Sequence, residues 1–142
     1  RHWLSLGNSP LPLEFHQEKT SQLLPQVDCA IVKSGTSTLE ATILKIPFAM
    51  MYRVSKISWY LMKPLVGTQT YCLANLVAGK PIAPEFVQQQ ATGKSIGSYI
   101  IELLEDDGKR SRIKKYFEAA TAKLGDKEAY AEGARRIIEH FL

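Results

Sequence analysis

The sequence has few of the residues that build metal centres and disulfide frameworks. It contains two cysteines, Cys29 and Cys72, and three histidines among 142 residues. Neither cysteine belongs to a Cys-x-x-Cys pair, and the histidines (His2, His16 and His140) are scattered along the chain. A metal site is therefore not expected. Both thiols lie in apolar stretches, which favours small hydrophobic groups in a reducing compartment.

Long apolar runs and strongly biased charge are also missing. No apolar run approaches the roughly 18 residues that a membrane-spanning helix needs, and no signal peptide is recognisable. The net charge of +4 permits an anionic ligand or a membrane surface without requiring either. Because no basic run is interleaved with aromatic residues, nucleic acid is not an expected partner. The length suits one globular domain, and a first residue that is Arg rather than Met suggests an excerpt from a longer chain.

One stretch combines a buried strand, a glycine turn and the start of a helix. Residues 29–32 form a short apolar run with β-branched members, which is typical of a buried parallel strand. Apolar residues then return at helical spacing, so a helix is expected over residues 37–45. Unpaired backbone N–H groups and the helix dipole make such a turn an anion site. We call its residues the phosphate cradle: Ser34, Gly35, Thr36, Ser37 and Thr38.

The same residues allow a purely structural interpretation. Ser37 and Glu40 fit a capping box, in which the Glu40 carboxylate accepts from the backbone N–H of Ser37. The turn lacks both the Gly-Lys-Ser/Thr ending of a P-loop and the spaced glycines of a dinucleotide fingerprint. Those two kinds of cofactor site are therefore not expected, whereas a ligand role and a cap both stay open for Glu40.

A second apolar run of strand length extends from Phe48 to Arg53, directly after Pro47. Strand, helix and strand within about 25 residues form a βαβ unit, which implies a parallel sheet and a right-handed crossover. Ligands of such sheets bind at the carboxyl ends of the strands. The phosphate cradle and Arg53 are expected to lie at that edge.

The helix expected over residues 56–66 has two interpretations. Ser55 can cap it, apolar side chains cover most of its circumference, and Lys56 and Lys63 share one face. The helix could be wedged between the sheet and a neighbouring chain. Alternatively, it could lie in a membrane interface with its lysines toward lipid phosphates.

The remaining segments predict a sheet followed by helices. We expect a strand over residues 11–15, a short helix over 21–24, a brief strand over 71–73 and a tight turn over 75–81. Pro84 suits the start of a helix, with Glu85 near its dipole. From residue 92 the spacing is helical, with a break at Gly108, a second helix over 113–124 and a third over 130–141. The expected fold class is α/β, a parallel layer followed by a helical tail over residues 92–142.

Several sequence blocks resemble lipid-A-disaccharide synthases, which are glycosyltransferases with the GT-B fold. The resemblance runs from about Leu23 to Gln88 and weakens in the helical tail. Ala74 departs from the pattern, because the family often has Pro before the following Asn. The matching blocks, in chain order, are Ala30–Ala41, Pro47, Tyr52-Arg53, Asn75-Leu76-Val77-Ala78 and Pro84-Glu85-Phe86-Val87-Gln88.

This resemblance implies a Rossmann-like nucleotide-binding domain, the C-terminal half of an enzyme with two such domains. Residues 1–142 would supply that domain without its first strand and helix. The family transfers 2,3-diacylglucosamine from UDP-2,3-diacylglucosamine to 2,3-diacylglucosamine 1-phosphate, giving the β-1,6-linked disaccharide and UDP. The resemblance also implies a cytoplasmic enzyme that binds peripherally to the phospholipid surface of the inner membrane of Gram-negative bacteria. An unpaired edge strand would also invite a homo-oligomer.

The resemblance further implies roles for individual residues. The phosphate cradle would bind the diphosphate, and Glu40 would accept hydrogen bonds from the ribose hydroxyl groups. Arg53, Asn75, Glu85 and Gln88 would lie near the donor sugar or the cleft. The catalytic base is expected in the absent N-terminal domain, so the isolated chain should be inactive. No metal ion or other cofactor is expected.

Other classes of protein stay open. The nearest enzyme alternative is another UDP-sugar enzyme of the same fold, such as an epimerase or the undecaprenyl-linked transferase of peptidoglycan synthesis. A non-catalytic module for nucleotide binding or membrane docking is the alternative from a different class. Failure to bind UDP together with binding to anionic vesicles would favour the docking module.

Overall fold

A computed structural model describes residues 14, 16–17, 19–62, 70–125 and 138–139. Within these residues the strands are β1 (Ala30–Lys33), β2 (Phe48–Tyr52) and β3 (Glu85–Val87). The α-helices are α1 (Thr20–Leu23), α2 (Thr36–Ile43), α3 (Lys56–Met62), α4 (Leu73–Ala78), α5 (Gly93–Glu105) and α6 (Asp107–Ala122). Short 3-10 turns occupy Leu24–Gln26 and Gln88–Gln90.

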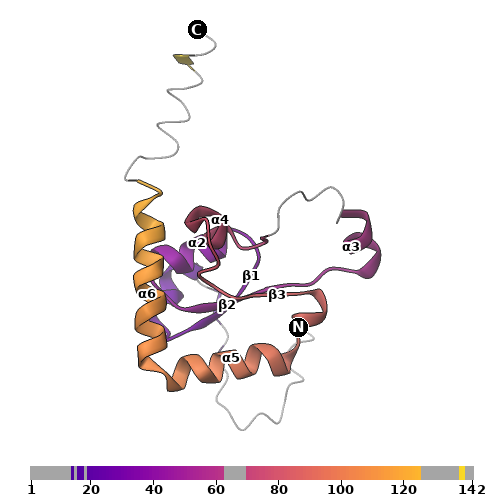
Figure 1. Cartoon of the computed structure of the whole chain (residues 1–142), viewed down its shortest axis with the longest axis horizontal. Coiled ribbons are helices and arrows are strands. Elements are labelled where there is room, and N and C mark those ends of the chain that lie inside the picture. The colour runs from indigo at the N-terminus through magenta and orange to yellow at the C-terminus, as the bar shows by residue number, and fades with distance from the viewer. Residues whose placement is uncertain (1–13, 15, 18, 63–69, 126–137, 140–142) are drawn as a thin grey trace.

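The strands form one parallel sheet in the order β1-β2-β3. In the register of the sheet, Val32 of β1 lies beside Met50 of β2, which lies beside Glu85 of β3. Helices α2 and α4 lie above the sheet in Figure 1 and α5 lies below it. Phe48, Ala49 and Met50 are therefore fully buried although they point to alternate faces. The predicted βαβ unit and α/β fold class are confirmed.

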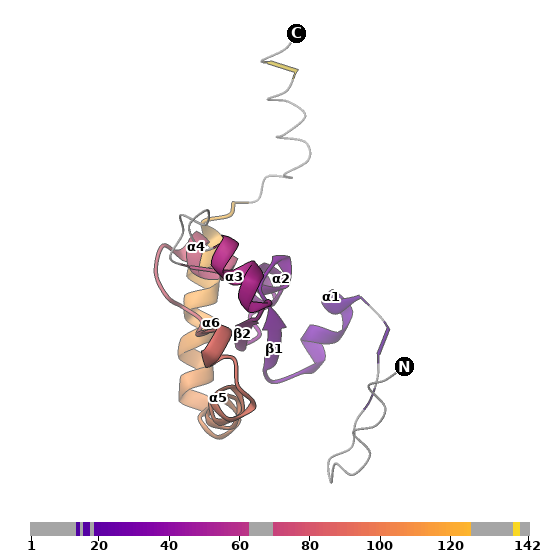
Figure 2. The same cartoon turned by 90° about the vertical axis from the view of Figure 1, so that its right-hand side faces the viewer.

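Helix α6 belongs to the core rather than to a separate tail. It packs against α2 and α4, and its Phe117 ring stacks on Phe48 of β2 with the ring centroids 5.3 Å apart. In Figure 2, α5 and α6 both lie to the left of β1 and β2. Helical structure after residue 92 is confirmed over α5 and α6, and its apolar face completes the core above and beside β2.

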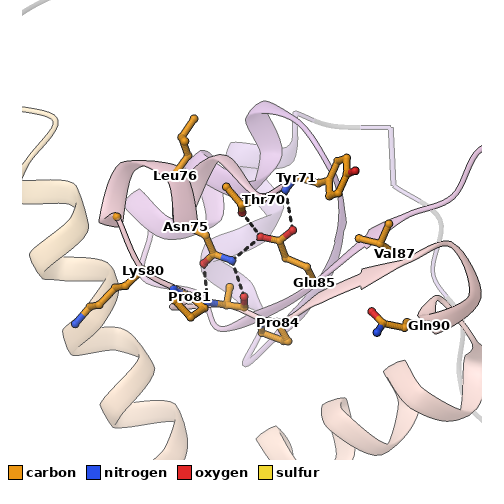
Figure 3. A pocket seen from close by; sticks show the side chains of 12 residues that line it. Thr70, Tyr71, Asn75, Leu76, Lys80, Pro81, Pro84, Glu85, Val87 and Gln90 are labelled. Carbon is orange, nitrogen blue, oxygen red and sulfur yellow. Dashed lines mark hydrogen bonds between the residues drawn. The ribbon is translucent and has the colours of Figure 1, made fainter. Parts of the chain in front are cut away.

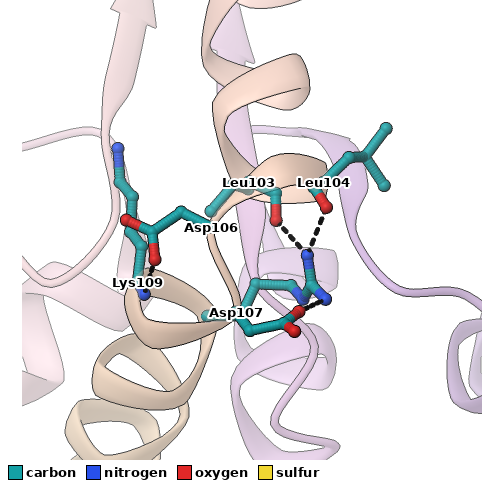
Figure 4. A network of polar contacts seen from close by, with 6 residues as sticks. Leu103, Leu104, Asp106, Asp107 and Lys109 are labelled. Carbon is teal, nitrogen blue, oxygen red and sulfur yellow. Dashed lines mark hydrogen bonds and ion pairs between the residues drawn. The ribbon is translucent and has the colours of Figure 1, made fainter.

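The junction between α5 and α6 differs slightly from the prediction. The break lies at Asp106, whose carboxylate accepts from the Lys109 N–H at 2.7 Å and caps α6, while Gly108 lies inside the helix. Arg110 donates to the carbonyl oxygens of Leu103 and Leu104 and pairs with Asp107 (Figure 4). Because these bonds satisfy carbonyl groups at the end of α5, the chain turns sharply without leaving them unpaired.

Three of the predicted elements, in two places, are wrong. The brief strand over 71–73 and the turn over 75–81 are replaced by α4, which ends at Gly79 with a left-handed φ of 71°. The helix predicted to begin at Pro84 is instead β3, because Glu85 to Val87 pair with the free side of β2. In both places a contact distant in sequence decides the local structure.

Some predictions lie outside the described residues. These are the end of the helix over 56–66 beyond Met62, the third C-terminal helix except Ile138 and Glu139, and the strand over 11–15 except Glu14. Among the helices that the structure describes, none combines the length and apolarity needed to cross a bilayer.

Candidate functional site

The carboxyl ends of the three strands bring several predicted site residues to one edge of the sheet. β1 leads into Ser34 and Gly35, β2 into Arg53, and β3 into Gln88. Because the strands are parallel and adjacent, these residues share the edge at which ligands of such sheets bind. The expected convergence of the phosphate cradle and Arg53 is confirmed.

Gly35 determines the shape of the phosphate cradle. It is the N-cap of α2, with a φ of 140° and a ψ of −161°, a backbone conformation that is essentially restricted to glycine. No side chain caps this helix. The first N–H groups of α2 therefore have no side-chain partner, and they point from a helix N-terminus as an anion site requires.

The hydroxyl groups of the cradle are mostly engaged within the chain. Ser34 Oγ donates to the Tyr71 carbonyl at 2.6 Å. Ser37 Oγ donates to the Lys33 carbonyl at 3.0 Å, and Thr38 Oγ1 donates to the Gly35 carbonyl at 2.8 Å. A hydroxyl has one proton to donate, so these three are already in use. The N–H groups of Ser34 and Thr38 also donate, to the carbonyl oxygens of Met51 and Gly35. The main open donors of the cradle are therefore the N–H groups of Gly35, Thr36 and Ser37.

Glu40 does not form the capping box. The N-cap is Gly35, and Ser37 lies in the first turn of α2 rather than before it. The Glu40 side chain is half-buried one turn farther along, and no hydrogen bond or ion pair to its carboxylate is found among the described residues. The structural interpretation of Glu40 is therefore wrong, and its ligand role stays a prediction.

Asn75 and Glu85 come together in one hydrogen-bonded network (Figure 3). The Glu85 carboxylate accepts from the Tyr71 N–H at 2.7 Å, from Asn75 Nδ2 at 2.8 Å, and from the Thr70 hydroxyl. Asn75 Nδ2 also donates to the Ala83 carbonyl at 2.8 Å, and Asn75 Oδ1 accepts from the N–H groups of Ile82 and Ala83. Both side chains thus have structural partners that the sequence did not predict.

This network is linked to the phosphate cradle through the backbone of one residue, Tyr71. The Tyr71 N–H binds Glu85, and the Tyr71 carbonyl binds the Ser34 hydroxyl. The segment before α4 is therefore held at both sides, by β3 through Glu85 and by the end of β1 through Ser34. Glu85 consequently helps to position the cradle through the Tyr71 backbone, whether or not it contacts a ligand.

A pocket of about 810 Å³ adjoins this network. Its wall combines Tyr71, Leu76 and Val87 with the polar side chains of Lys80 and Gln90, and Asn75 and Glu85 form its floor toward the sheet (Figure 3). The sequence did not indicate Tyr71 or Lys80 as site residues. No local pattern distinguishes them, because the pocket arises from the packing of α4 beside β3.

Gln88 and Arg53 occupy the same edge in different ways. Gln88 is buried with a φ of 51°, and its Oε1 accepts from the Val54 N–H at 3.1 Å. It therefore fixes the turn that follows β2. Arg53, immediately before Val54, is exposed and available to an anion.

The cysteines behave as expected for small apolar groups. Cys72 is buried and Cys29 half-buried, and both thiols are free. Burial raises the pKa of the Cys72 thiol, and it also raises the pKa of Cys29, where Asp28 adds to the effect. In the part of the chain that the structure describes, no cluster of three or more His, Cys, Asp or Glu residues is placed to bind a metal ion.

A parallel sheet covered by helices on both faces, with a glycine-led helix N-terminus at its carboxyl edge, defines a Rossmann-like α/β domain. Comparison with models of protein families then identifies the family to which this domain belongs. The model described as lipid-A-disaccharide synthetase matches residues 5–138, and the chain belongs to this family.

Curated relatives agree with this assignment. The chain is 33% identical over 133 residues to a lipid-A-disaccharide synthase of Pseudomonas paraeruginosa, covering 94% of this chain and 34% of the relative. It is 34% identical over 120 residues to that of Koribacter versatilis (82% and 31% covered), and 30% identical over 128 residues to that of Nitrosococcus oceani (90% and 32% covered). The chain thus spans about a third of the length of these relatives.

Proposed function

We propose that this chain is the UDP-binding part of a glycosyltransferase of lipid A biosynthesis. The whole protein would transfer 2,3-diacylglucosamine from UDP-2,3-diacylglucosamine to 2,3-diacylglucosamine 1-phosphate and release UDP. Family membership supports this class of enzyme. The observation that carries the proposal is the uncapped N-terminus of α2 behind Gly35, at the carboxyl edge of the sheet.

In the proposed reaction, this domain stabilises the leaving group, UDP. The acceptor hydroxyl attacks the anomeric carbon while the bond from that carbon to the UDP oxygen breaks, and negative charge develops on the diphosphate. Fixed N–H donors and a helix dipole stabilise such charge best when they are already in place. The first turn of α2 meets this condition, because the φ of Gly35 fixes the direction of its N–H groups. The proposal includes no metal ion.

The other residues take supporting roles in this proposal. Glu40, with no partner among the described residues, would accept from the ribose hydroxyls. Arg53 would approach a phosphate from the end of β2. Asn75, Glu85 and Gln88 would border the donor sugar while their hydrogen bonds hold the surrounding backbone. The base that deprotonates the acceptor would lie in the rest of the parent protein.

The surroundings of the enzyme follow from its substrates. Both carry acyl chains, so we propose a peripheral association with the cytoplasmic face of the inner membrane of a Gram-negative bacterium. A homo-oligomer is a further proposal, since β1 is an edge strand within the described sheet and its outer backbone groups can pair.

The test is turnover by the full-length protein with the two acylated substrates, followed by mass spectrometry of the disaccharide 1-phosphate. The variant Gly35→Ala should lower kcat/KM for the donor at least about tenfold, because an alanine at this φ costs roughly 1–3 kcal/mol and shifts the N–H groups. Gly97→Ala is the matched control, since a Cβ at this helical position meets no atom within 4 Å. Absence of the disaccharide, or turnover of UDP-N-acetylglucosamine in its place, would refute the proposed function.

A further inference from the structure

One long segment of the chain has basic residues but no acidic ones. Between Glu40 and Glu85 there is no Asp or Glu, whereas Lys45, Arg53, Lys56, Lys63 and Lys80 all fall in this interval. The overall charge of +4 is therefore distributed unevenly, and the segment that contains α3 is positive throughout. Lys45 is paired with Glu118 at 2.7 Å, whereas Arg53 and Lys56 are exposed and no ion pair to either is found among the described residues. The surface around Arg53 and Lys56 therefore attracts anions.

Helix α3 places this charge beside an exposed apolar face. Ile57, Tyr60 and Leu61 are 75%, 74% and 68% exposed, which is more than any other large hydrophobic side chain among the described residues. Arg53 and Lys56, both exposed, lie just before them in the chain. We call these five residues the α3 surface.

The α3 surface is held outward by a contact on its inner side. Trp59 is half-buried, and its ring lies 5.7 Å from that of Tyr71, which in turn lies 5.6 Å from Tyr52 at the end of β2. Figure 1 shows α3 apart from α2, α4 and α6, at the far right of the molecule. The helix is therefore fixed to the carboxyl edge of the sheet through aromatic rings while Ile57, Tyr60 and Leu61 face away from the core.

The composition of this surface selects its partner. Aliphatic side chains enter the boundary between headgroups and acyl chains, and tyrosine prefers the headgroup level. Lysine and arginine next to them bind anionic headgroups, each strengthening membrane binding about fivefold. The combination of widely exposed aliphatic side chains with adjacent cations, and no acidic residue from 41 to 84, favours an anionic bilayer over a protein partner.

We propose that the α3 surface docks the protein on an anionic phospholipid bilayer. This inference rests on the proposed function in one respect, because acylated substrates reach the enzyme from a membrane. Arg53 belongs both to the α3 surface and to the carboxyl edge of the sheet. Docking through α3 consequently brings the phosphate cradle close to the bilayer from which the donor is taken.

The experiment is flotation of the full-length protein with vesicles of phosphatidylethanolamine and phosphatidylglycerol, compared with vesicles of phosphatidylcholine alone. The double variant Ile57→Ser/Leu61→Ser should lower partitioning to the anionic vesicles at least about tenfold. Lys56→Gln should lower it about fivefold, and added salt should reduce that difference. The matched controls on α5 are Ile101→Ser/Leu104→Ser and Lys94→Gln. They change exposed residues of the same types outside the α3 surface and should float like the wild type.

Thermal unfolding and UDP affinity of the same variants separate docking from folding. Unchanged values together with lost flotation support the proposal. Partitioning equal to that of the wild type overturns it. So does a lowered melting temperature with unchanged partitioning, because the surface would then pack against another part of the protein. Failure of the wild type to bind UDP would instead refute the proposed function and leave the vesicle result standing.

Discussion

Three of the four hydroxyl groups in the phosphate cradle already donate within the chain, to the carbonyl oxygens of Lys33, Gly35 and Tyr71. Their protons hold the turn rather than a ligand. The sequence suggests that these hydroxyl groups donate to a ligand. In the structure they mainly hold the backbone of the turn, and its N–H groups remain as donors. Gly35 is the residue on which this arrangement depends, since its φ of 140° opens the first turn of α2.

Glu85 has a comparable structural role, and it can be tested by stability. Glu85→Ala removes the acceptor of the Tyr71 N–H and of one Asn75 N–H, and leaving these partly buried donors unpaired should cost about 1–3 kcal/mol. The measurement is urea-induced unfolding followed by circular dichroism. Glu105→Ala, an exposed residue of α5, is the control and should change the free energy of unfolding by no more than about 0.5 kcal/mol. A loss for Glu85→Ala no larger than for the control would contradict this role.

At the scale of elements, the helices differ in how well their sequence defines them. The cradle, α2 and the two strands β1 and β2 were predictable because strand composition, a glycine turn and helical periodicity agree over 24 residues, 30–53. α5 and α6 follow from their apolar spacing. In each of these cases the local pattern and the tertiary position favour the same structure.

α4 and β3 were not predictable, because their structure depends on distant partners. α4 has six residues, too few for a periodic pattern, and its Asn75 binds backbone groups of residues 82 and 83. β3 has three residues and exists because β2 has a free edge. Pro84 suits the start of a helix equally well, so the pairing of residues 85–87 with β2 determines that this segment is a strand.

The packing of α5 predicts a specific alkaline instability. Tyr99 lies between Phe86 of β3 and the Lys109 ammonium, and burial, with a smaller contribution from Glu102, raises its pKa from 10 to about 12. An unfolded chain therefore loses this phenolic proton first. Stability from Tyr99 is intact below pH 10 and is lost as the pH rises from about 10 to about 12.

Tyr99→Phe should flatten this loss. Measured by urea unfolding at pH 9 and pH 11, the free energy of unfolding of the variant should fall less than that of the wild type. Tyr60→Phe, at an exposed position of α3, is the control and should follow the wild type. Equal pH dependence in Tyr99→Phe and the wild type would show that the Tyr99 hydroxyl is solvated like any surface tyrosine.

At the scale of the whole molecule, the described structure corresponds to only part of the length of its relatives. The chain matches about a third of its curated relatives, and β1 has no neighbouring strand on its outer side among the described residues. In the proposed enzyme, a further strand from the parent protein or from a second copy would pair there. The cradle, Arg53 and the α3 surface would then all border the same substrate-binding region.

The central claim is that the N-terminal half of α2 binds UDP, and calorimetric titration of UDP tests it most directly. The full-length protein, Glu40→Ala and the control Glu105→Ala are titrated under the same conditions. Saturable binding is expected for the wild type and the control. For Glu40→Ala, UDP binding should be weaker by about 1–3 kcal/mol, the cost of losing a polar partner of the ribose. Equal UDP affinity in all three proteins would contradict the ribose role of Glu40, and absence of UDP binding to the full-length wild type would contradict the account as a whole.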